Sequence, residues 1–264
     1  MSVFLPFEQD GWRGLIAEGF TLPSVEAFLA EGGQTLLVES PCRTVAHHSL
    51  GRTSPVYAKL MRAQNDTAFQ KREFWAHWKW ANGPSRAIHI LHVSAEMLRD
   101  GFHCPEPLLA VRKREPNGWH KNLLVTAEVL APTLEKSLDN TNDESEREAL
   151  VREAAKALFQ FHAKGYVHGD FLPRNCCLDR VTGQFFFLDN DKTFHWRHLR
   201  PFWMLRKRNL EQFAYNLMRR EGFQECHDSL ARAFLEEYGA LSGKSINRAY
   251  QNALSRWQHH RHSK

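Results

Sequence analysis

The period of apolar and polar positions changes along the chain and divides it into a strand-rich first half and a mainly helical second half. Three stretches, QTLLVES, RTVAHHSL and SPVYAKLM, carry Val, Leu, Thr and Tyr between Ser, Pro and Gly breakers. This pattern predicts three successive antiparallel strands. Two further strands are predicted in HCPEPLLAVRKR and WHKNLLVTAEVL, joined by a Pro/Asn/Gly turn at 116–118. The first thirty residues, which include FTLPSVEAFLAEGG, are expected to form an N-terminal helix or extension.

Helical periodicity begins between the third and fourth of these strands. A helix is predicted over roughly 65–80, where Phe69, Glu73 and His77 recur four residues apart. The large aromatic residues beside them are expected to pack into the core. These aromatic residues are Phe74, Trp75 and Trp78.

Three more helical regions follow. One is predicted over 85–101 and ends at Gly101. A long helix is predicted to open in the acidic segment 137–146, where Thr141 and Glu144 have the spacing of a capping box, and to stop at Gly165. The chain is predicted to be helical again from about residue 209.

Between the last two helical regions lies a short strand–turn–strand unit. It is read from NCCLD, a VTG turn and FFFLDND. The order of elements predicts an α+β bilobal layout with a boundary near residue 131, where Ala-Pro-Thr breaks the pattern. We therefore expect an extension at 1–33, a small strand-rich N-lobe at 34–131 and a mainly helical C-lobe at 132–264.

Composition narrows the class of protein. The 264 residues are 42% apolar and 25% charged, which is typical of a soluble globular chain. A net charge of +5 suggests phosphate, nucleic acid or anionic lipid as a partner. The five cysteines are odd in number and lack CxxC spacing, so a reducing compartment is expected. With no signal peptide and no apolar run of roughly 18 residues, a cytoplasmic protein is predicted, one able to lie on a membrane surface. The 15 histidines are scattered and show no HExxH spacing, so a structural zinc site is not expected.

Candidate catalytic residues are concentrated in the segment VHGDFLPRN, residues 167–175. Phosphoryl transfer requires an oriented hydroxyl, neutralised phosphate charge and bound magnesium. Asp170 could accept a hydroxyl proton, Asn175 could hold one magnesium ion, and Asp189, fourteen residues later, could hold the ion that bridges the phosphates. Lys59, on a predicted N-terminal strand, could pair with the phosphates if Glu73 on the following helix fixes it.

These intervals resemble a protein-kinase-like fold over roughly residues 34–220. More narrowly, HGD followed by PRN, FFFLDNDK, KREFWAHWKW and PEPLLAVRKR resemble the lipopolysaccharide kinase family of Kdo and heptose kinases. The resemblance implies ATP- and Mg²⁺-dependent phosphorylation of a sugar hydroxyl in the lipopolysaccharide inner core. It does not say which sugar, heptose or Kdo, is the acceptor.

The resemblance also implies individual roles. Asp170 would be the catalytic base, Asn175 and Asp189 the magnesium ligands, and Lys59 with Glu73 the phosphate-pairing couple. Arg174 would place a positive charge by the transferred phosphate, Asp191 would be an auxiliary acid, and His168 would orient the loop. Glu128 would lie at the hinge with its backbone towards adenine, and Cys176 and Cys177 are expected to be small core residues.

The chain departs from the kinase pattern in its phosphate loop. No G-x-G-x-x-G occurs between the first two predicted strands, where the turn is SPCRT and the nearest glycine is Gly51. Backbone amides or Arg43 would have to replace it. No APE-type segment follows Asp189, which argues against a protein substrate. A kinase of a soluble small molecule, such as an aminoglycoside or a choline-like alcohol, and a pseudokinase scaffold stay open as alternatives.

The segment KTFHWRHLRPFWMLRKR at 192–208 contains six Lys or Arg residues and no acid. It is either a solvated face with core aromatic residues or a surface for anionic glycolipid head groups at the cytoplasmic leaflet. Because it follows the kinase constellation directly, a nucleic-acid partner is not expected.

Overall fold

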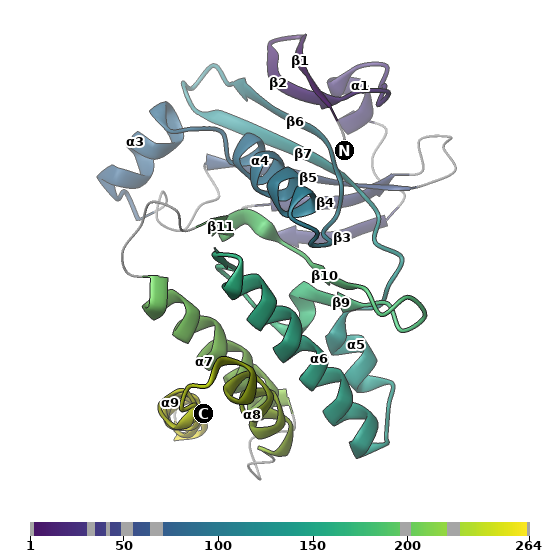
Figure 1. The fold of residues 1–264 in the computed structure, drawn as a ribbon. Coiled ribbons are helices and arrows are strands. Elements are labelled where there is room, and N and C mark those ends of the chain that lie inside the picture. The colour runs from purple at the N-terminus through teal and green to yellow at the C-terminus, as the bar shows by residue number, and fades with distance from the viewer. Residues whose placement is uncertain are drawn as a thin grey trace. The chain divides into compact units, whose positions relative to one another are not determined.

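The computed structural model describes residues 3–30, 35–40, 43–48, 55–63, 71–195, 202–220 and 228–262. The chain divides into two compact units, Met1–Val129 and Leu130–Lys264. The first is built around a sheet and the second is mainly helical (Figure 1). The predicted α+β class is thus confirmed.

A seven-stranded antiparallel sheet forms the first unit, in the order β1-β2-β6-β7-β5-β4-β3. The predicted strands β3 to β7 are all present. Their bounds are Thr35–Ser40 for β3, Arg43–His48 for β4, Val56–Arg62 for β5, Pro107–Arg114 for β6 and His120–Ala127 for β7.

The start of the chain differs from the expected helix or extension. Strands β1 (Phe4–Gln9) and β2 (Trp12–Ala17) form a hairpin, and β2 pairs with β6. Asp10 and Gly11, the two residues of the hairpin turn, have φ angles of 52° and 78°, and Asp-Gly is a preferred pair for such turns. Only α1 (Val25–Ala30) is helical here.

Both faces of the sheet carry apolar core. On one face Leu109, Val111 and Leu123 pack with Phe28 of α1. On the other, Ala110 and Leu124 pack with residues of α4 (Arg86–Arg99). The two sets alternate along the same strands, as the two-residue period of a strand requires.

Helix α3 (Phe74–Asn82) corrects two predictions. The first part of the helix predicted over 65–80 falls within residues 64–70, outside the described part, and residues 71–73 are not helical. Its aromatic residues do not pack in the core: Phe74, Trp75 and Trp78 are exposed by 70%, 74% and 51%. The residue that does pack inward is Trp80, which is 5% exposed. Aromatic content alone did not reveal which side of this helix is buried.

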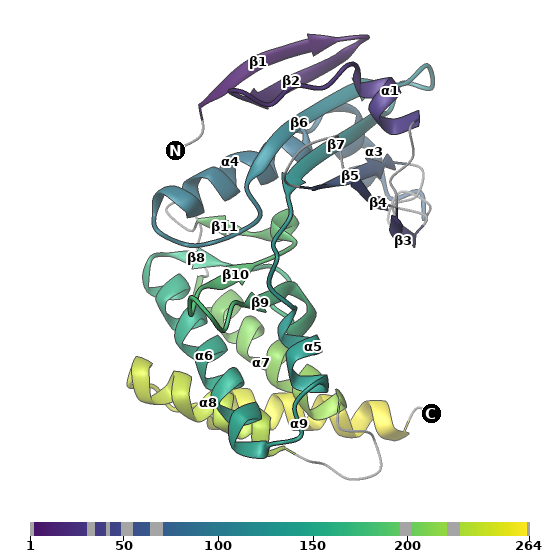
Figure 2. The same ribbon diagram turned by 90° about the vertical axis from the view of Figure 1, so that its right-hand side faces the viewer.

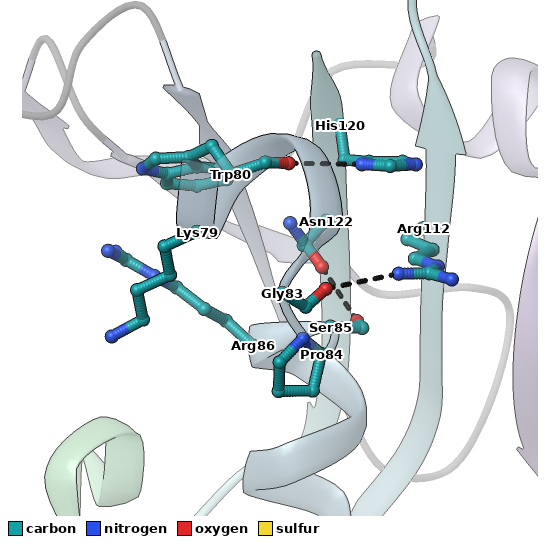
Figure 3. A pocket seen from close by; sticks show the side chains of 9 residues that line it. All are labelled: Lys79, Trp80, Gly83, Pro84, Ser85, Arg86, Arg112, His120 and Asn122. Atoms are coloured by element: carbon teal, nitrogen blue, oxygen red, sulfur yellow. Dashed lines mark hydrogen bonds between the residues drawn. The ribbon is translucent and has the colours of Figure 1, made fainter. Parts of the chain in front are cut away.

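The connection between α3 and α4 is fixed by polar contacts around a small pocket (Figure 3). Ser85 caps α4 by accepting a bond from the backbone N–H of Ile88, and its hydroxyl donates to Oδ1 of Asn122 over 2.6 Å. Arg112 donates to the carbonyl of Gly83 over 3.4 Å. The pocket volume of about 10 Å³ is far too small for a nucleotide.

The second unit is a layer of helices beside two small two-stranded sheets (Figure 2). The helices are α5 (Leu134–Asp139), α6 (Glu144–Ala163), α7 (Phe202–Arg220), α8 (Ser229–Ser242) and α9 (Asn247–His262). One sheet pairs β8 (Tyr166–Val167) with β11 (Phe194–His195), and the other is the hairpin of β9 (Cys176–Leu178) and β10 (Phe185–Phe187). The strand–turn–strand prediction is confirmed by β9 and β10.

The start of α6 corrects the predicted capping box. Asp143 is the N-cap, and its side chain accepts a hydrogen bond from the N–H of Ser145. Thr141 instead donates to the carboxylate of Glu146 over 2.6 Å.

Within the described residues, no helix has both the length and the apolar character needed to cross a membrane.

Candidate active site

The loop between β8 and β9 carries three of the candidate residues of the second unit, Asp170, Arg174 and Asn175. Residues 167–175, here named the HGD loop, end in the 3-10 turn η2 (Pro173–Asn175). A Cβ atom at Gly169 would collide with the backbone and side chain of Lys192 in the turn η3 (Asn190–Lys192). Glycine therefore allows the loop to approach the segment that carries Asp189.

His168 is completely buried and uses both ring nitrogens. The backbone N–H of Asp170 donates to Nδ1 over 3.2 Å, so the proton is on Nε2, which donates to the carbonyl of Leu188 over 2.8 Å. Burial lowers the pKa of His168 below its usual value, in agreement with a neutral ring. The ring ties the loop to the residue before Asp189, which supports an orienting role.

The Asp170 carboxylate is held by two amide side chains. Nε2 of Gln212 donates to Oδ1 over 2.7 Å, and Nδ2 of Asn175 donates to Oδ2 over 3.3 Å and to the Asp170 carbonyl over 2.9 Å. With both carboxylate oxygens bonded, one rotamer is favoured. Each oxygen keeps a further lone pair that can accept a proton from a hydroxyl group.

Asn175 and Asp189 are linked through the backbone of the β9–β10 hairpin. The N–H of Leu188 donates to the carbonyl of Asn175 over 2.8 Å. Asp189 has φ 56° and ψ 55°, a left-handed conformation that is uncommon outside glycine. Such strained positions cluster at functional sites, so the backbone favours a functional role for Asp189.

The donor chemistry of this pair fits magnesium. Because Nδ2 of Asn175 binds Asp170, its Oδ1 is left as a hard oxygen donor, and Asp189 adds a carboxylate. Mg²⁺ is commonly held by one or two protein oxygens together with phosphates and waters. In the described ranges no group of three or more His, Cys, Asp or Glu side chains could hold a metal. A magnesium site here would thus take its remaining ligands from phosphate and water.

Helix α7 anchors the HGD loop through two residues that sequence reasoning missed. Asn209 donates to the carbonyl of His168, and Gln212, one turn later, binds the carboxylate described above. Asn209 shares a helix face with Phe213 and Leu217, which are both buried. Its amide at an apolar position was the available signal, because a buried amide needs partners.

His162 of α6 extends this anchoring to α8. Its Nε2 donates to Oδ1 of Asn209 over 3.1 Å, and its Nδ1 accepts from the Tyr238 hydroxyl over 2.8 Å. Arg206 donates to the same hydroxyl over 3.1 Å. Burial is the main reason that the pKa of His162 is lowered to about 3. Three helices therefore hold the loop through one chain of hydrogen bonds.

Lys59 belongs to the first unit and is 9% exposed. On β5 its neighbours Ala58 and Leu60 pack on the α1 face of the sheet, whereas Met61 packs on the face that α4 covers. Lys59 lies on the α4 face by strand alternation. Burial in a central strand is unusual for lysine, which excludes a solvated strand lysine and favours a binding role.

Glu73 is exposed and is the N-cap residue of α3, but its side chain does not cap the helix. The helix that packs against the sheet is α4, whose single acidic residue is Glu96, a half-buried carboxylate. Glu96 forms an ion pair with Arg99 of the same helix over 3.5 Å. Because α4 covers the face on which Lys59 lies, Glu96 is still the second carboxylate to test as its partner.

The remaining candidates occupy simpler environments. Arg174 is exposed in η2, and Asp191 is half-buried in η3. The Glu128 carboxylate accepts a hydrogen bond from the Tyr57 hydroxyl over 2.8 Å. Buried Cys176 and Cys177 match the expected core role, and burial raises the pKa of Cys177 to about 11.

Some sequence-based candidates lie outside the described residues. The turn that would replace a Gly-rich loop includes residues 41–42, and Gly51 is also outside the described ranges. The same holds for the side chain of Arg43 and for residues 196–201 of the basic segment.

The sheet unit, the helical unit and the HGD loop define a kinase-like protein. The model of the lipopolysaccharide kinase (Kdo/WaaP) family matches residues 59–238, so the chain belongs to this family. The resemblance seen in the sequence is thus confirmed. A solved structure described as WaaP in complex with acyl carrier protein matches with a TM-score of 0.56 at 16% identity, over 90% of this chain and 91% of that one. At this identity the likeness concerns the fold alone. No curated protein matches the chain.

Proposed function

We propose that this protein is an ATP- and Mg²⁺-dependent kinase that phosphorylates a sugar hydroxyl, of heptose or Kdo, in the lipopolysaccharide inner core. The observation that carries the proposal is the hydrogen-bonded arrangement of Asp170, Asn175 and the hairpin ending at Asp189. It occurs in a chain of the lipopolysaccharide kinase family.

In the proposed reaction Asp170 accepts the proton of the acceptor hydroxyl as its oxygen attacks the phosphoryl group. The amides of Gln212 and Asn175 keep the carboxylate in one orientation without protonating it. A positioned general base contributes roughly 10²–10⁴-fold to a rate. Arg174, on the same loop, stabilises the negative charge of the transferred group.

The other roles concern the nucleotide. Lys59 pairs with the phosphates and is steadied by a carboxylate, Glu73 from the sequence pattern or Glu96 from the packing of α4. Asn175 and Asp189 hold magnesium, with Asp191 as an auxiliary acid. ATP with its magnesium ion supplies the phosphoryl group and neutralises part of its charge.

We assign nucleotide binding to residues 34–131 and acceptor binding to residues 132–264. The lipopolysaccharide core glycolipid would be the partner, and no nucleic acid is required. Because this acceptor is attached to lipid, we place the protein in the cytoplasm, peripheral to the inner face of the cytoplasmic membrane.

The decisive experiment measures transfer of labelled phosphate from ATP and magnesium to purified lipopolysaccharide that lacks core phosphate. We expect label in a core sugar with the wild-type protein and none with Asp170→Asn. Mapping the labelled sugar would distinguish heptose from Kdo.

Two outcomes would contradict the proposal. ATP binding without transfer to any core acceptor would favour a soluble small-molecule acceptor such as an aminoglycoside. Failure to bind ATP at all would favour a pseudokinase scaffold.

A further inference from the structure

Helix α3 exposes a cluster of large aromatic side chains. Phe74, Trp75 and Trp78 are exposed by 70%, 74% and 51%, and at 100° per residue they lie within an arc of about 100° on the helix. Their rings meet edge to face, with centroids 5.6 Å apart for Phe74–Trp75 and 6.3 Å apart for Trp75–Trp78. These three side chains are named here the aromatic face of α3.

The opposite side of α3 is attached to the sheet unit. Trp80 packs in the core that α4 shares, and its carbonyl oxygen bonds to Nδ1 of His120 over 3.0 Å. His77 packs edge-on against Trp119 with ring centroids 5.3 Å apart. The aromatic face is therefore presented by a helix that is held in place from behind.

Cationic side chains border the aromatic face. Lys71, Arg72 and Lys79 are exposed, and Glu73 is the single acid between residues 71 and 82. Arg86 is not part of this border, because its guanidinium lies over the ring of buried Trp80, 4.5 Å from the centroid. The local charge is thus positive around an apolar centre.

This combination matches the chemistry of a membrane interface. Tryptophan and phenylalanine enter the boundary between head groups and acyl chains, and lysine and arginine meet lipid phosphates. The cores of protein–protein interfaces are also rich in aromatic residues, but they are depleted of lysine, so the exposed lysines are the feature that favours a lipid surface. The net charge of +5 also favours binding to an anionic lipid surface.

We propose that the aromatic face of α3 is a membrane-contacting surface that inserts into a bilayer containing anionic lipid. The choice of a bilayer as partner rests in part on the proposed function, in which the acceptor is a glycolipid. The surface would hold the enzyme at the membrane that contains its acceptor.

The test is co-sedimentation of the full chain with vesicles of phosphatidylcholine alone and of phosphatidylcholine mixed with phosphatidylglycerol. We expect binding to the anionic vesicles that weakens as salt is added. The variant Phe74→Ser/Trp75→Ser/Trp78→Ser should bind the anionic vesicles at least about tenfold more weakly than the wild type. Val181→Ser is the matched control, because Val181 is 95% exposed in the β9–β10 turn of the other unit, and it should bind as the wild type does.

Unfolding temperatures would verify that the triple variant folds, which its surface positions favour. Lack of binding to either vesicle, or equal binding by the triple variant, would overturn the proposal. So would a wild-type dimer that the triple substitution abolishes, since the face would then bind a second copy of the chain. The vesicle assay measures binding and not catalysis, so its result can be interpreted even if no phosphate is transferred. If transfer occurs, the triple variant should lose it with vesicle-bound acceptor and keep it with lipid-free core oligosaccharide.

Discussion

The HGD loop and the start of α3 place candidate polar residues in opposite environments. On the loop, Asp170 is held by Gln212 and Asn175. At the start of α3, Glu73 is exposed, and the helix that follows leaves its aromatic face open. The first region has a geometry fixed from the protein side, whereas the second presents its groups to something outside the chain.

The comparison separates two ways of building a site. Buried polar groups must find partners, so a network such as that of Asn209 and His162 has one low-energy arrangement and specifies the loop it supports. An exposed carboxylate is not held in one arrangement by such partners, and an ion pair that it forms contributes little to stability. The predictions below test whether function follows this difference in environment.

The largest expected effect is on the proposed base. Asp170→Asn keeps the size of the side chain and removes its ability to accept a proton, so kcat should fall by roughly 10³-fold. Nucleotide affinity and unfolding temperature should change little. Gln212 can donate to the new carbonyl oxygen, and Asn175 loses its 3.3 Å bond to the side chain but keeps its 2.9 Å bond to the backbone carbonyl of residue 170. Steady-state kinetics, nucleotide-binding titrations and thermal unfolding would measure the three quantities.

A joint loss of ATP binding and folded structure would argue that Asp170 is structural. Val181→Ser, remote from the loop and exposed, provides the unaffected comparison.

A second prediction compares two carboxylates in the first unit. Glu96→Gln should lower kcat/KM for ATP by roughly tenfold to a hundredfold, because Glu96 is on the helix that covers the Lys59 face of the sheet. Glu73→Gln should cost less than about threefold, since an exposed carboxylate is well screened. Initial rates over a range of ATP concentrations would rank the two variants.

A greater loss with Glu73→Gln would restore the pairing indicated by the sequence. Equal, small losses in both variants would mean that Lys59 acts without either carboxylate.

The site residues that the sequence could locate are those joined by local spacing. The interval between Asp170 and Asn175 places them in one turn, and the structure shows them hydrogen-bonded. The Val, Leu and Tyr residues between Ser and Pro breakers similarly identified β5, the strand that contains Lys59. Such features depend on a few consecutive residues and survive any larger rearrangement.

What the sequence could not supply depends on contacts between distant segments. Gln212 reaches a residue 42 positions earlier, and nothing near it in the chain marks that contact. The prediction of which side of α3 is buried was wrong, because Trp75, Trp78 and Trp80 are equally apolar. Composition therefore did not show which one packs on the sheet. The β1–β2 hairpin was missed although Asp10-Gly11 is a turn signal, because Pro6 and Gly14 interrupt the apolar segments on either side and make each of them a weak strand signal.

A third prediction concerns the support of the base. Gln212→Met has similar volume but cannot donate a hydrogen bond, so the Asp170 carboxylate would lose one restraint on its orientation. Hydrogen bonds to charged groups contribute about 1.5–3 kcal/mol, and kcat should fall by roughly tenfold with KM for ATP unchanged. Asn216→Ala, on the same helix, removes a bond from the Asn216 side chain to the Gln212 backbone carbonyl and leaves the bond from Gln212 to Asp170 in place, so it serves as the control.

An unchanged kcat in Gln212→Met would show that Asn175 alone orients the carboxylate. A rise in KM for ATP with constant kcat would instead place Gln212 in nucleotide binding.

The smallest predicted effect is on stability and not on turnover. His162 is buried and neutral, with a pKa of about 3, against 6.5 for the unfolded chain. The unfolded state therefore binds more protons than the folded state below pH 6.5. The contribution of His162 to the free energy of unfolding is complete above that pH and declines as the pH falls towards 3. At about pH 5 the loss from this residue should be about 2 kcal/mol. Buried His168, whose pKa is also lowered, would add to the loss.

Urea unfolding between about pH 7.5 and about pH 5 would measure this dependence. In His162→Gln the amide can donate to Asn209 and accept from Tyr238 as the neutral ring does, so the variant should lose less stability over this range than the wild type. His92→Gln, at an exposed position on α4, should keep the wild-type slope. Identical slopes for all three proteins would mean that His162 takes up its proton without unfolding, and that the buried network is more accessible to water than its hydrogen bonds indicate.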